Sequence, residues 1–216
     1  MKMKMKIISM FIVFVTFISY AQAQNKSETF PLGSKQKVST NEAVATFAEG
    51  CFWHSEIVFQ SLVGVRDAVS GYSGGSDNHP SYEKVSTGTT GHAEAVQVYY
   101  DPSKITYQTL VSAFFASQNP TTMNRQGNDI GTQYRSVAFY RNEKEKQIIT
   151  DEIKRLTDSK KYNNKIVTEV IPFKLFYSAE EYHQEYIHNH PDEGYVRHVS
   201  IPEFMEFKNE FKANYK

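Results

Sequence analysis

Apolar and polar residues follow two different periods along this chain of 216 residues. Short stretches alternate strictly, as half-buried strands do, and longer stretches repeat an apolar residue every three or four positions, as helices with one buried face do. Alternation predicts strands over 44–50, at the start of 63–75, and over 91–102, 136–140 and 167–172. The longer period predicts a helix of about three turns from Cys51. Further helices are predicted over 106–117, 142–158 and 200–215.

Other stretches carry signals for loops and helix starts. Residues 119–134 are mainly polar and contain two glycines and a proline, which predicts a long loop. Ser178 and Glu181 have the spacing of a capping box, and Pro202 suits the first turn of the closing helix. Because strands and helices are mixed without strict alternation, the sequence predicts an α+β fold. We expect a two-layer sandwich in which helices pack on a mixed β-sheet, an elaborated ferredoxin-like arrangement.

The N-terminal residues have the layout of a secretory signal peptide. Three lysines precede an apolar run over 7–20, and small residues follow at Ala21 and Ala23. The run is shorter than the roughly 20 residues of a membrane span, although an uncleaved anchor is the alternative. We therefore predict export to the periplasm or the medium, with cleavage near Gln24. The predicted division is a signal peptide at 1–23, a flexible leader at 24–41 and a single domain at 42–216.

Charge narrows the partners. The chain has 24 basic and 24 acidic side chains, and three of the basic ones lie in the signal peptide. The small acidic excess of the remainder argues against nucleic-acid binding. We predict a monomer without stable membrane association once the signal peptide is removed.

Cys51 is the only cysteine, so the chain forms no internal disulfide. It lies between a predicted strand that stops at Gly50 and a predicted helix. Unpaired N–H groups at a helix start stabilise an anion, which predicts a lowered thiol pKa and a nucleophilic thiolate. Gly50 allows a sharp turn and close approach of a substrate. A buried, inert cysteine is the alternative.

Several other residues are candidates for chemistry near the thiol. Phe52 and Trp53 are suited to an apolar pocket, or else to core packing. Glu94 shares a strand face with valines, so burial would raise its pKa and make it a proton donor near neutral pH. The alternative register points Glu94 into water. Tyr82 and Tyr134 lie at loop ends, where a hydroxyl can reach a ligand.

Asp129 and the histidines give weaker signals for a site. Asp129, between two loop glycines, is either a turn former or a polar site residue. The histidines lack the spacing of known zinc motifs, so no metal is predicted. A cysteine hydrolase with Cys51 as nucleophile, His92 as base and Asp129 as its orienting group is compatible with the sequence, but no spacing requires it.

Longer motifs resemble a known family, the A-type peptide methionine sulfoxide reductases, over roughly residues 43–190. The matching segments are GCFW at 50–53, GYSGG at 71–75, YEKVSTGTTGHAEAVQVYYDP at 82–102, NPTTMNRQGNDIGTQYRS at 119–136 and HQEYI at 183–187. Their order and length make the resemblance specific. It implies a protein-repair enzyme that reduces the S epimer of methionine sulfoxide, free or in oxidised proteins, without metal or organic cofactor.

The resemblance also implies roles for single residues. Cys51 is implied as the nucleophile that attacks the sulfoxide sulfur and becomes a sulfenic acid, and Glu94 as the acid that protonates the sulfoxide oxygen. Tyr82 and Tyr134 are implied to hold that oxygen. Phe52 and Trp53 are implied to form the pocket for the methyl group, and Gly50 to let the substrate approach. Asp129 is implied either to support the groups around the site or to position the substrate.

One departure from the family pattern concerns the C-terminus. Many family members carry further cysteines in a glycine-rich tail that resolve the sulfenic acid, whereas residues 187–216 contain none. The chain therefore resembles a single-cysteine form that depends on an external thiol, from a thioredoxin-like or glutaredoxin-like protein or a small molecule. A binding module that has lost turnover is the remaining alternative.

Overall fold

The computed structural model describes residues 38–216. The predicted signal peptide and most of the predicted leader lie outside these residues. The strands are β1 Ala43–Glu49, β2 Val65–Ser73, β3 Ala93–Tyr100, β4 Arg125–Gln126, β5 Asp129–Ile130, β6 Ser136–Tyr140, β7 Glu169–Pro172 and β8 Phe176–Ser178. The α-helices are α1 Phe52–Gln60, α2 Tyr82–Ser86, α3 Tyr107–Ala116, α4 Glu143–Asp158, α5 Tyr186–Asn189 and α6 Ile201–Glu210.

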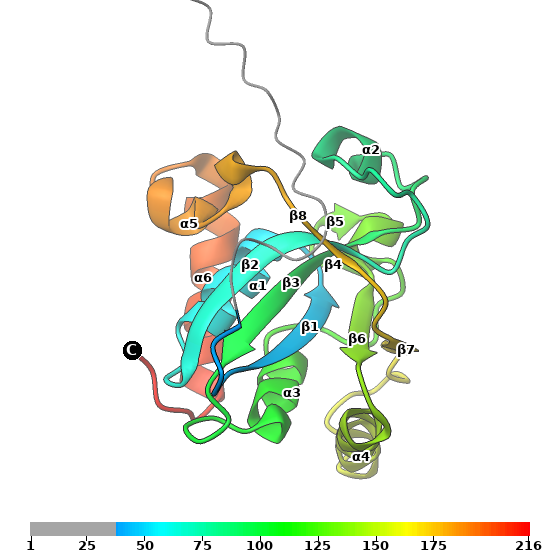
Figure 1. The fold of residues 1–216 in the computed structure, drawn as a ribbon, viewed down its shortest axis with the longest axis vertical. Coiled ribbons are helices and arrows are strands. Elements are labelled where there is room, and N and C mark those ends of the chain that lie inside the picture. The colour runs from blue at the N-terminus through cyan, green and yellow to red at the C-terminus, as the bar shows by residue number, and fades with distance from the viewer. Residues whose placement is uncertain (1–37) are drawn as a thin grey trace, which may run out of the picture.

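A six-stranded mixed sheet forms the centre of the molecule, in the order β7-β6-β1-β3-β2-β8 (Figure 1). Only the β6–β7 pair is parallel within this sheet. In chain order, and with α2 and the β4–β5 hairpin as insertions, the elements β1, α1, β2, β3, α3 and β6 give the inner order β6-β1-β3-β2, which is the split βαβ arrangement of ferredoxin-like folds. The predicted α+β sandwich with helices on a mixed sheet is therefore confirmed.

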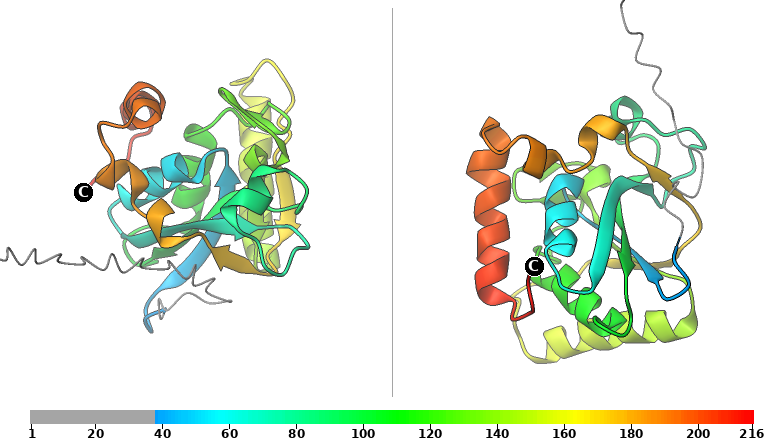
Figure 2. Two further views of the ribbon diagram at one scale, coloured as in Figure 1. Left: turned by 90° about the horizontal axis from the view of Figure 1, so that it is seen from above. Right: turned by 60° about the vertical axis from the view of Figure 1, so that its left-hand side comes forward.

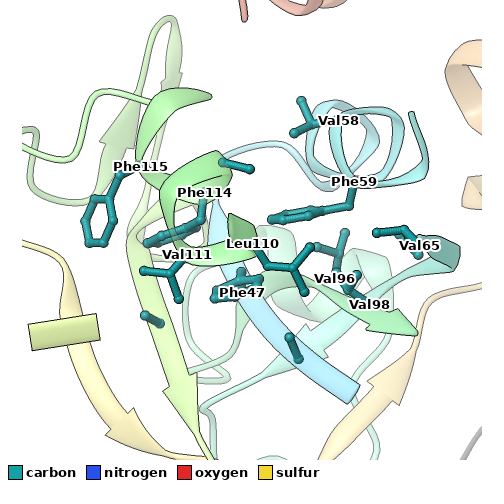
Figure 3. Close-up of a cluster of buried hydrophobic side chains, with 14 of the residues drawn as sticks. Phe47, Val58, Phe59, Val65, Val96, Val98, Leu110, Val111, Phe114 and Phe115 are labelled. Carbon is teal, nitrogen blue, oxygen red and sulfur yellow. The ribbon is translucent and has the colours of Figure 1, made fainter. Parts of the chain in front are cut away.

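The larger core lies between the sheet and the helices α1 and α3. Phe47 of β1 stacks on Phe59 of α1 at 5.2 Å and on Phe114 of α3 at 5.1 Å between ring centroids. Figure 3 shows these rings with the valines of β3 beneath the two helices. This packing fixes α1 against the sheet, and with it the residues at the start of α1.

The opposite face of the sheet carries a second, smaller core. Only residues 173–175 join β7 at one edge to β8 at the other, so the sheet is curled and this segment crosses its second face (Figure 1). Phe173 and Phe176 pack there against Ala93 and Ala95 of β3. Strand β3 is consequently buried on both faces, which a simple alternating pattern does not reveal.

The C-terminal segment covers α1 from outside the sheet. A π-helical turn at Val196–Ser200 leads into α6, which runs beside α1 (Figure 2). Pro202 lies in the first turn of α6, as predicted, and Phe207 enters the larger core. The last residues return to the end of α1, where Val63 N–H donates to the Asn214 carbonyl at 2.9 Å.

Two local predictions need correction, and two short elements are additional. Residues 119–134 are not an open loop, because β4 and β5 form a small hairpin followed by a 3₁₀ turn at Thr132–Tyr134. Ser178 does not start a helix, because it belongs to β8 and pairs with Gly71 of β2. The short elements α2 and β8 were not predicted. None of the helices described between residues 38 and 216 has the length and apolar character needed to cross a membrane.

Candidate active site

Cys51 lies at the junction that the sequence predicts, between β1 and α1. It is the residue that immediately precedes α1, and its carbonyl accepts the His54 N–H at 3.1 Å. Gly50 adopts φ +106°, and a Cβ at this position would lie 2.7 Å from the Gln126 side chain. Glycine is therefore required by the turn and by the β4–β5 hairpin packed on it. Cys51 as a residue keeps part of its surface exposed.

A cavity of about 210 Å³ opens beside the thiol, and we call it the aromatic cavity. Its lining residues are Cys51, Phe52, Trp53, Tyr82, Glu94, Asp129, Tyr134 and Tyr195. The structure thus brings together every predicted site residue except Gly50. Gly50 lines neither this cavity nor a second cavity described below. The residues come from α1, α2, β3 and β5, the 3₁₀ turn and the C-terminal segment, so only the folded chain assembles them.

Glu94 is a buried carboxyl at the wall of the aromatic cavity. Its side chain is 2 % exposed, and its Oε2 accepts the backbone N–H of Phe52 at 3.1 Å. Burial raises its pKa to about 8, partly offset by that hydrogen bond. The prediction that Glu94 faces apolar surroundings is confirmed. At neutral pH the group is mainly a neutral acid that can donate a proton.

The thiol itself differs from the sequence prediction. Burial and then the charge of Glu94 raise the pKa of Cys51, and the N–H groups of Trp53 and His54 offset only part of this. The expected lowering at a helix start is therefore wrong for the free site, because desolvation outweighs the N–H groups. Cys51 and Glu94 both rest in their neutral forms near pH 7. The pair holds two protons next to the cavity.

The aromatic wall is held by partners outside the predicted set. Trp53 Nε1–H donates to His183 Nδ1 at 3.2 Å, and the indole stacks on Tyr186 with 3.7 Å between centroids and 5° between planes. Phe52 is 1 % exposed and packs against Tyr72, Tyr82 and His183. Both rings are fixed before any ligand arrives, which suits them to shape a pocket for a small apolar group.

Hydroxyl groups converge on the same cavity. Burial raises the pKa of Tyr134, and its hydroxyl makes no hydrogen bond with another residue of 38–216. Tyr82 begins α2, anchored by the bond from its backbone N–H to Glu180 Oε1 at 3.0 Å. Asp129 accepts the hydroxyl of Tyr195 at 2.6 Å. With a raised pKa, the Tyr134 hydroxyl is therefore a neutral hydrogen-bond donor at physiological pH.

Tyr195 and His183 were missed by sequence reasoning. The chain has 14 tyrosines and 7 histidines, and neither residue has neighbours that set it apart. Tyr195 reaches the site only because the C-terminal segment folds over α1, placing it against Asp129, 66 positions earlier. His183 lies in the HQEYI segment, but nothing in that segment points to Trp53. No sequence signal available here identifies either role.

The geometry does not support a hydrolase dyad. His92 accepts the Gly75 N–H at Nδ1 and contacts the Asp77 carbonyl through Nε2, at 3.1 and 2.8 Å. Both ring nitrogens are occupied, and His92 lines neither cavity next to Cys51. Among residues 38–216 no group of three or more histidine, cysteine or acidic side chains is arranged to hold a metal ion.

A second cavity, of about 270 Å³, meets the first at Cys51, and we call it the acidic cavity. Its lining includes the buried side chains of Glu49 and His54, which flank Cys51 in the sequence, and buried amide atoms of Gln118 after α3, and we call these three residues its floor. Asp129, Glu203, Glu206 and Glu210 add carboxyl groups, with Lys161 as the basic side chain. The two cavities share Cys51, Asp129 and Tyr195. The thiol is thus open to two chemically different spaces.

Comparisons with known proteins give one consistent family. The family model described as "Peptide methionine sulfoxide reductase" matches residues 43–215. Peptide methionine sulfoxide reductase MsrA 1 of Rhodopirellula baltica is 45% identical over 81% of this chain and 90% of its own length. MsrA of Sulfolobus acidocaldarius is 46% identical over 78% of this chain and 94% of its own.

Solved structures agree with the sequence comparisons. The crystal structure of reduced Mxr1 from Saccharomyces cerevisiae has a TM-score of 0.66 at 36% identity, covering 73% of this chain and 91% of that one. Methionine sulfoxide reductase A of Corynebacterium diphtheriae has a TM-score of 0.64 at 32% identity, covering 71% and 77%. The fold and the sequence are thus similar to the same group of enzymes over most of the chain.

Proposed function

Because the chain belongs to the peptide methionine sulfoxide reductase family, whose members are oxidoreductases acting on methionine sulfoxide, we propose that Cys51 and Glu94 carry out this reduction in the aromatic cavity. The observation that carries the assignment is the buried, hydrogen-bonded carboxyl of Glu94 lining one small cavity with the only thiol of the chain. The sulfoxide sulfur faces Cys51, and the sulfoxide oxygen faces Glu94 and the tyrosines.

The first half-reaction moves one oxygen atom. Glu94 gives its proton to the sulfoxide oxygen, which makes the sulfur electrophilic, and the Cys51 sulfur attacks it. The thiol proton passes to the Glu94 carboxylate, so the acid is restored. The oxygen then ends on Cys51 as a sulfenic acid and methionine leaves. The sulfoxide is reduced by two electrons and the cysteine sulfur is oxidised by two.

Substrate orientation follows from the walls of the cavity. Phe52 and Trp53 contact the methyl group of the sulfoxide, and their fixed rings leave room for one orientation of it. Tyr82 and Tyr134 donate hydrogen bonds to the oxygen, while Asp129 with Tyr195 positions the rest of the side chain. Because methyl and oxygen have separate places, the pocket selects one epimer at sulfur, and the resemblance to the family makes this the S epimer.

The sulfenic acid is reset by a thiol from outside the chain. Cys51 is the only cysteine, so no second cysteine of the same chain can form the resolving disulfide. We propose a thioredoxin-like or glutaredoxin-like protein, or a small thiol, as reductant, and no metal or organic cofactor. The signal-like N-terminus supports repair of oxidised proteins in the periplasm or the medium. Mass spectrometry of the native protein tests this, since an N-terminus near Gln24 is expected.

Steady-state assays with separate sulfoxide epimers test the proposed function. The protein is incubated with dithiothreitol and either the S or the R epimer of a blocked methionine sulfoxide, and methionine formation is measured. Turnover of the S epimer alone is expected. Absence of turnover would favour a binding module, and equal turnover of both epimers would contradict the orientation by Phe52 and Trp53.

A further inference from the structure

We propose that the acidic cavity is the binding site for the reductant's thiol, that it accepts neutral or positively charged thiols and disfavours anionic ones, and that Glu49 donates the proton with which the sulfenic oxygen leaves as water. This inference rests on the proposed function, since it concerns the second half-reaction at the same Cys51. In this proposal the sulfoxide binds in the aromatic cavity and the thiol of the reductant binds in the acidic cavity.

Glu49 is the first observation that points to a ligand in this cavity. Its side chain is 1 % exposed, and Oε2 accepts the Ser117 hydroxyl at 2.9 Å. Its other oxygen, Oε1, has no hydrogen-bond partner among residues 38–216, since the nearby Ser55 hydroxyl donates to the Cys51 carbonyl. A buried oxygen without a partner is costly unless a ligand uses it. Glu49 directly precedes Gly50 and lines the same cavity as Cys51, so its carboxyl borders the space that a group on the thiol would enter.

Two neighbours share this property. His54 is 6 % exposed and contacts the Ser117 carbonyl through Nε2 at 3.2 Å, and the Ser200 backbone oxygen also lies near the ring, but no group of residues 38–216 has hydrogen-bond geometry to its Nδ1. Both amide atoms of Gln118 are buried and likewise lack a partner among these residues. All three side chains line the acidic cavity. Several polar groups without hydrogen-bond partners in one cavity wall indicate a binding site for a polar ligand rather than ordinary core packing.

The protonation states suit a proton donor. Burial raises the pKa of Glu49 to about 8, with the Ser117 and Ser55 hydroxyls partly offsetting it. Burial lowers the pKa of His54 to about 4, with the backbone oxygens of Ser117 and Ser200 partly offsetting it. At neutral pH Glu49 is therefore mainly the neutral acid and His54 the neutral imidazole. The floor of the cavity offers a proton without carrying a charge.

The chemistry balances with two thiols. The first thiol's sulfur bonds to Cys51 as the sulfur–oxygen bond breaks, and the hydroxyl leaves as water with the proton of Glu49. The proton of that thiol returns to the Glu49 carboxylate. A second thiol then attacks the mixed disulfide, releasing the Cys51 thiol and an external disulfide. The sulfenic acid gains two electrons, and the two external thiols supply them.

The rim of the cavity decides which thiols enter. Glu203, Glu206 and Glu210 on α6 are exposed, and Asp129 is half-buried. Lys161 is the single lysine or arginine in the lining. Carboxylates in the lining of a cavity attract a cation and repel an anion, and both effects are strongest at low salt. An anionic tripeptide thiol would therefore enter less readily than an uncharged one.

The test separates the two half-reactions. The reduced protein is first mixed with methionine-S-sulfoxide without any thiol, and methionine and trapped sulfenic acid are measured. Cysteamine, 2-mercaptoethanol or 3-mercaptopropionate is then added, and the loss of sulfenic acid is followed. Reduced thioredoxin as a fourth reductant shows whether a protein thiol uses the same cavity, because its rate then responds to the variants like those of the small thiols.

The rim is tested with Glu206→Gln/Glu210→Gln. Comparing the rate ratio of cysteamine to 3-mercaptopropionate between variant and wild type cancels the intrinsic reactivity of the thiols. We expect this ratio to fall about fivefold at low salt. The control Glu143→Gln/Asp151→Asn removes two exposed carboxyls from α4 and should leave the ratio unchanged. An unchanged ratio in the rim variant would overturn the proposed selectivity.

The proton donor is tested with Glu49→Gln, which keeps shape and hydrogen bonding. We expect the second half-reaction to slow about 10²-fold with every small thiol, and the first to keep its rate. Glu56→Gln, a buried carboxyl that lines neither cavity, is the matched control. Equal slowing of both half-reactions, or of neither, would overturn the role of Glu49. If wild type forms no methionine in the first step, the proposed function fails instead.

Discussion

The aromatic cavity and the acidic cavity share one thiol but are built from different side chains. The aromatic cavity has stacked rings fixed by His183 and Tyr186, and one buried acid, Glu94. The acidic cavity has unpaired polar atoms on its floor, carboxylates on its rim and its own buried acid, Glu49. Both acids have a pKa of about 8, raised by burial. The two spaces thus offer the same proton chemistry to ligands of different polarity.

The different walls explain how one cysteine can take part in two half-reactions. The methyl group of the sulfoxide suits the aromatic rings of one cavity. The reaction with a thiol, which releases water, suits the polar floor of the other. In the proposed scheme each side has its own proton donor, so neither half-reaction depends on the other's acid. The following variants test that division, beginning with the largest expected effect.

Removing the shared thiol should abolish both half-reactions. Cys51→Ser replaces the nucleophile with a hydroxyl of much higher pKa, and we expect turnover to fall by about 10³-fold or more. Methionine formation with dithiothreitol is the measurement, and circular dichroism checks that the fold is intact. Retention of substantial activity would mean that Cys51 is not the residue that takes the oxygen.

Removing the acid of the aromatic cavity should affect only one side. In Glu94→Gln we expect kcat of the first half-reaction to fall about 10²-fold with little change in KM, because the proton is needed in the transition state. Reduction of a sulfenic acid formed beforehand should keep its rate. An equal loss in both half-reactions would break the division between the cavities.

The pH profile of the first half-reaction follows from the same group. The raised pKa means that Glu94 is protonated below about pH 8 and loses its proton above it. The wild-type rate should therefore fall as pH rises through about 8, and the rate of Glu94→Gln should lack this step. Cys51, Asp129, Tyr82 and Tyr134 face Glu94 across the cavity. A wild-type rate that rises through this range would contradict the neutral-pair scheme.

A single hydroxyl should matter less than the acid. Tyr134→Phe removes one hydrogen bond to the sulfoxide oxygen, and we expect about a tenfold lower kcat of the first half-reaction. Tyr140→Phe, on the outer end of β6, is a control of the same chemical change. Single-turnover rates with both variants measure the effect. Equal rates for Tyr134→Phe and wild type would remove that hydroxyl from the mechanism.

The shared residue Tyr195 offers the finest distinction. Tyr195→Phe breaks the bond to Asp129 at the boundary of the two cavities, so we expect a loss of about threefold in both half-reactions, within the range of one hydrogen bond. Measuring both steps on the same sample is the check. A loss confined to one half-reaction would assign Tyr195 to a single cavity.

Local patterns in the sequence predicted much of the fold and the burial of Glu94, whereas the family resemblance supplied most of the roles in the aromatic cavity. The alternation in 91–102 identified β3 and placed Glu94 on the valine face, where burial raises its pKa. The pattern missed that both faces of β3 are buried, because the covering residues Phe173 and Phe176 arrive from the β7–β8 connection. Strand alternation does not record what covers the second face.

Other features depend on contacts between distant residues, which local patterns do not contain. The capping spacing of Ser178 fails because pairing with Gly71 places it in a strand. The pKa of Cys51 was predicted too low because the helix-start argument contains no desolvation. The C-terminal segment brings Tyr195 to the site and forms one wall of the acidic cavity by folding over α1. A motif therefore predicts which residues react, and the tertiary fold determines their charge states and access.

A single-turnover experiment tests whether Cys51 takes the oxygen atom of the sulfoxide. The reduced protein is mixed with an excess of racemic methionine sulfoxide in the absence of any thiol, and the products are quantified by chromatography and intact-protein mass spectrometry. The account predicts one methionine per protein, consumption of the S epimer alone, and the gain of one oxygen atom at Cys51. Continued turnover without a thiol, or methionine formation with an unmodified Cys51, would contradict it.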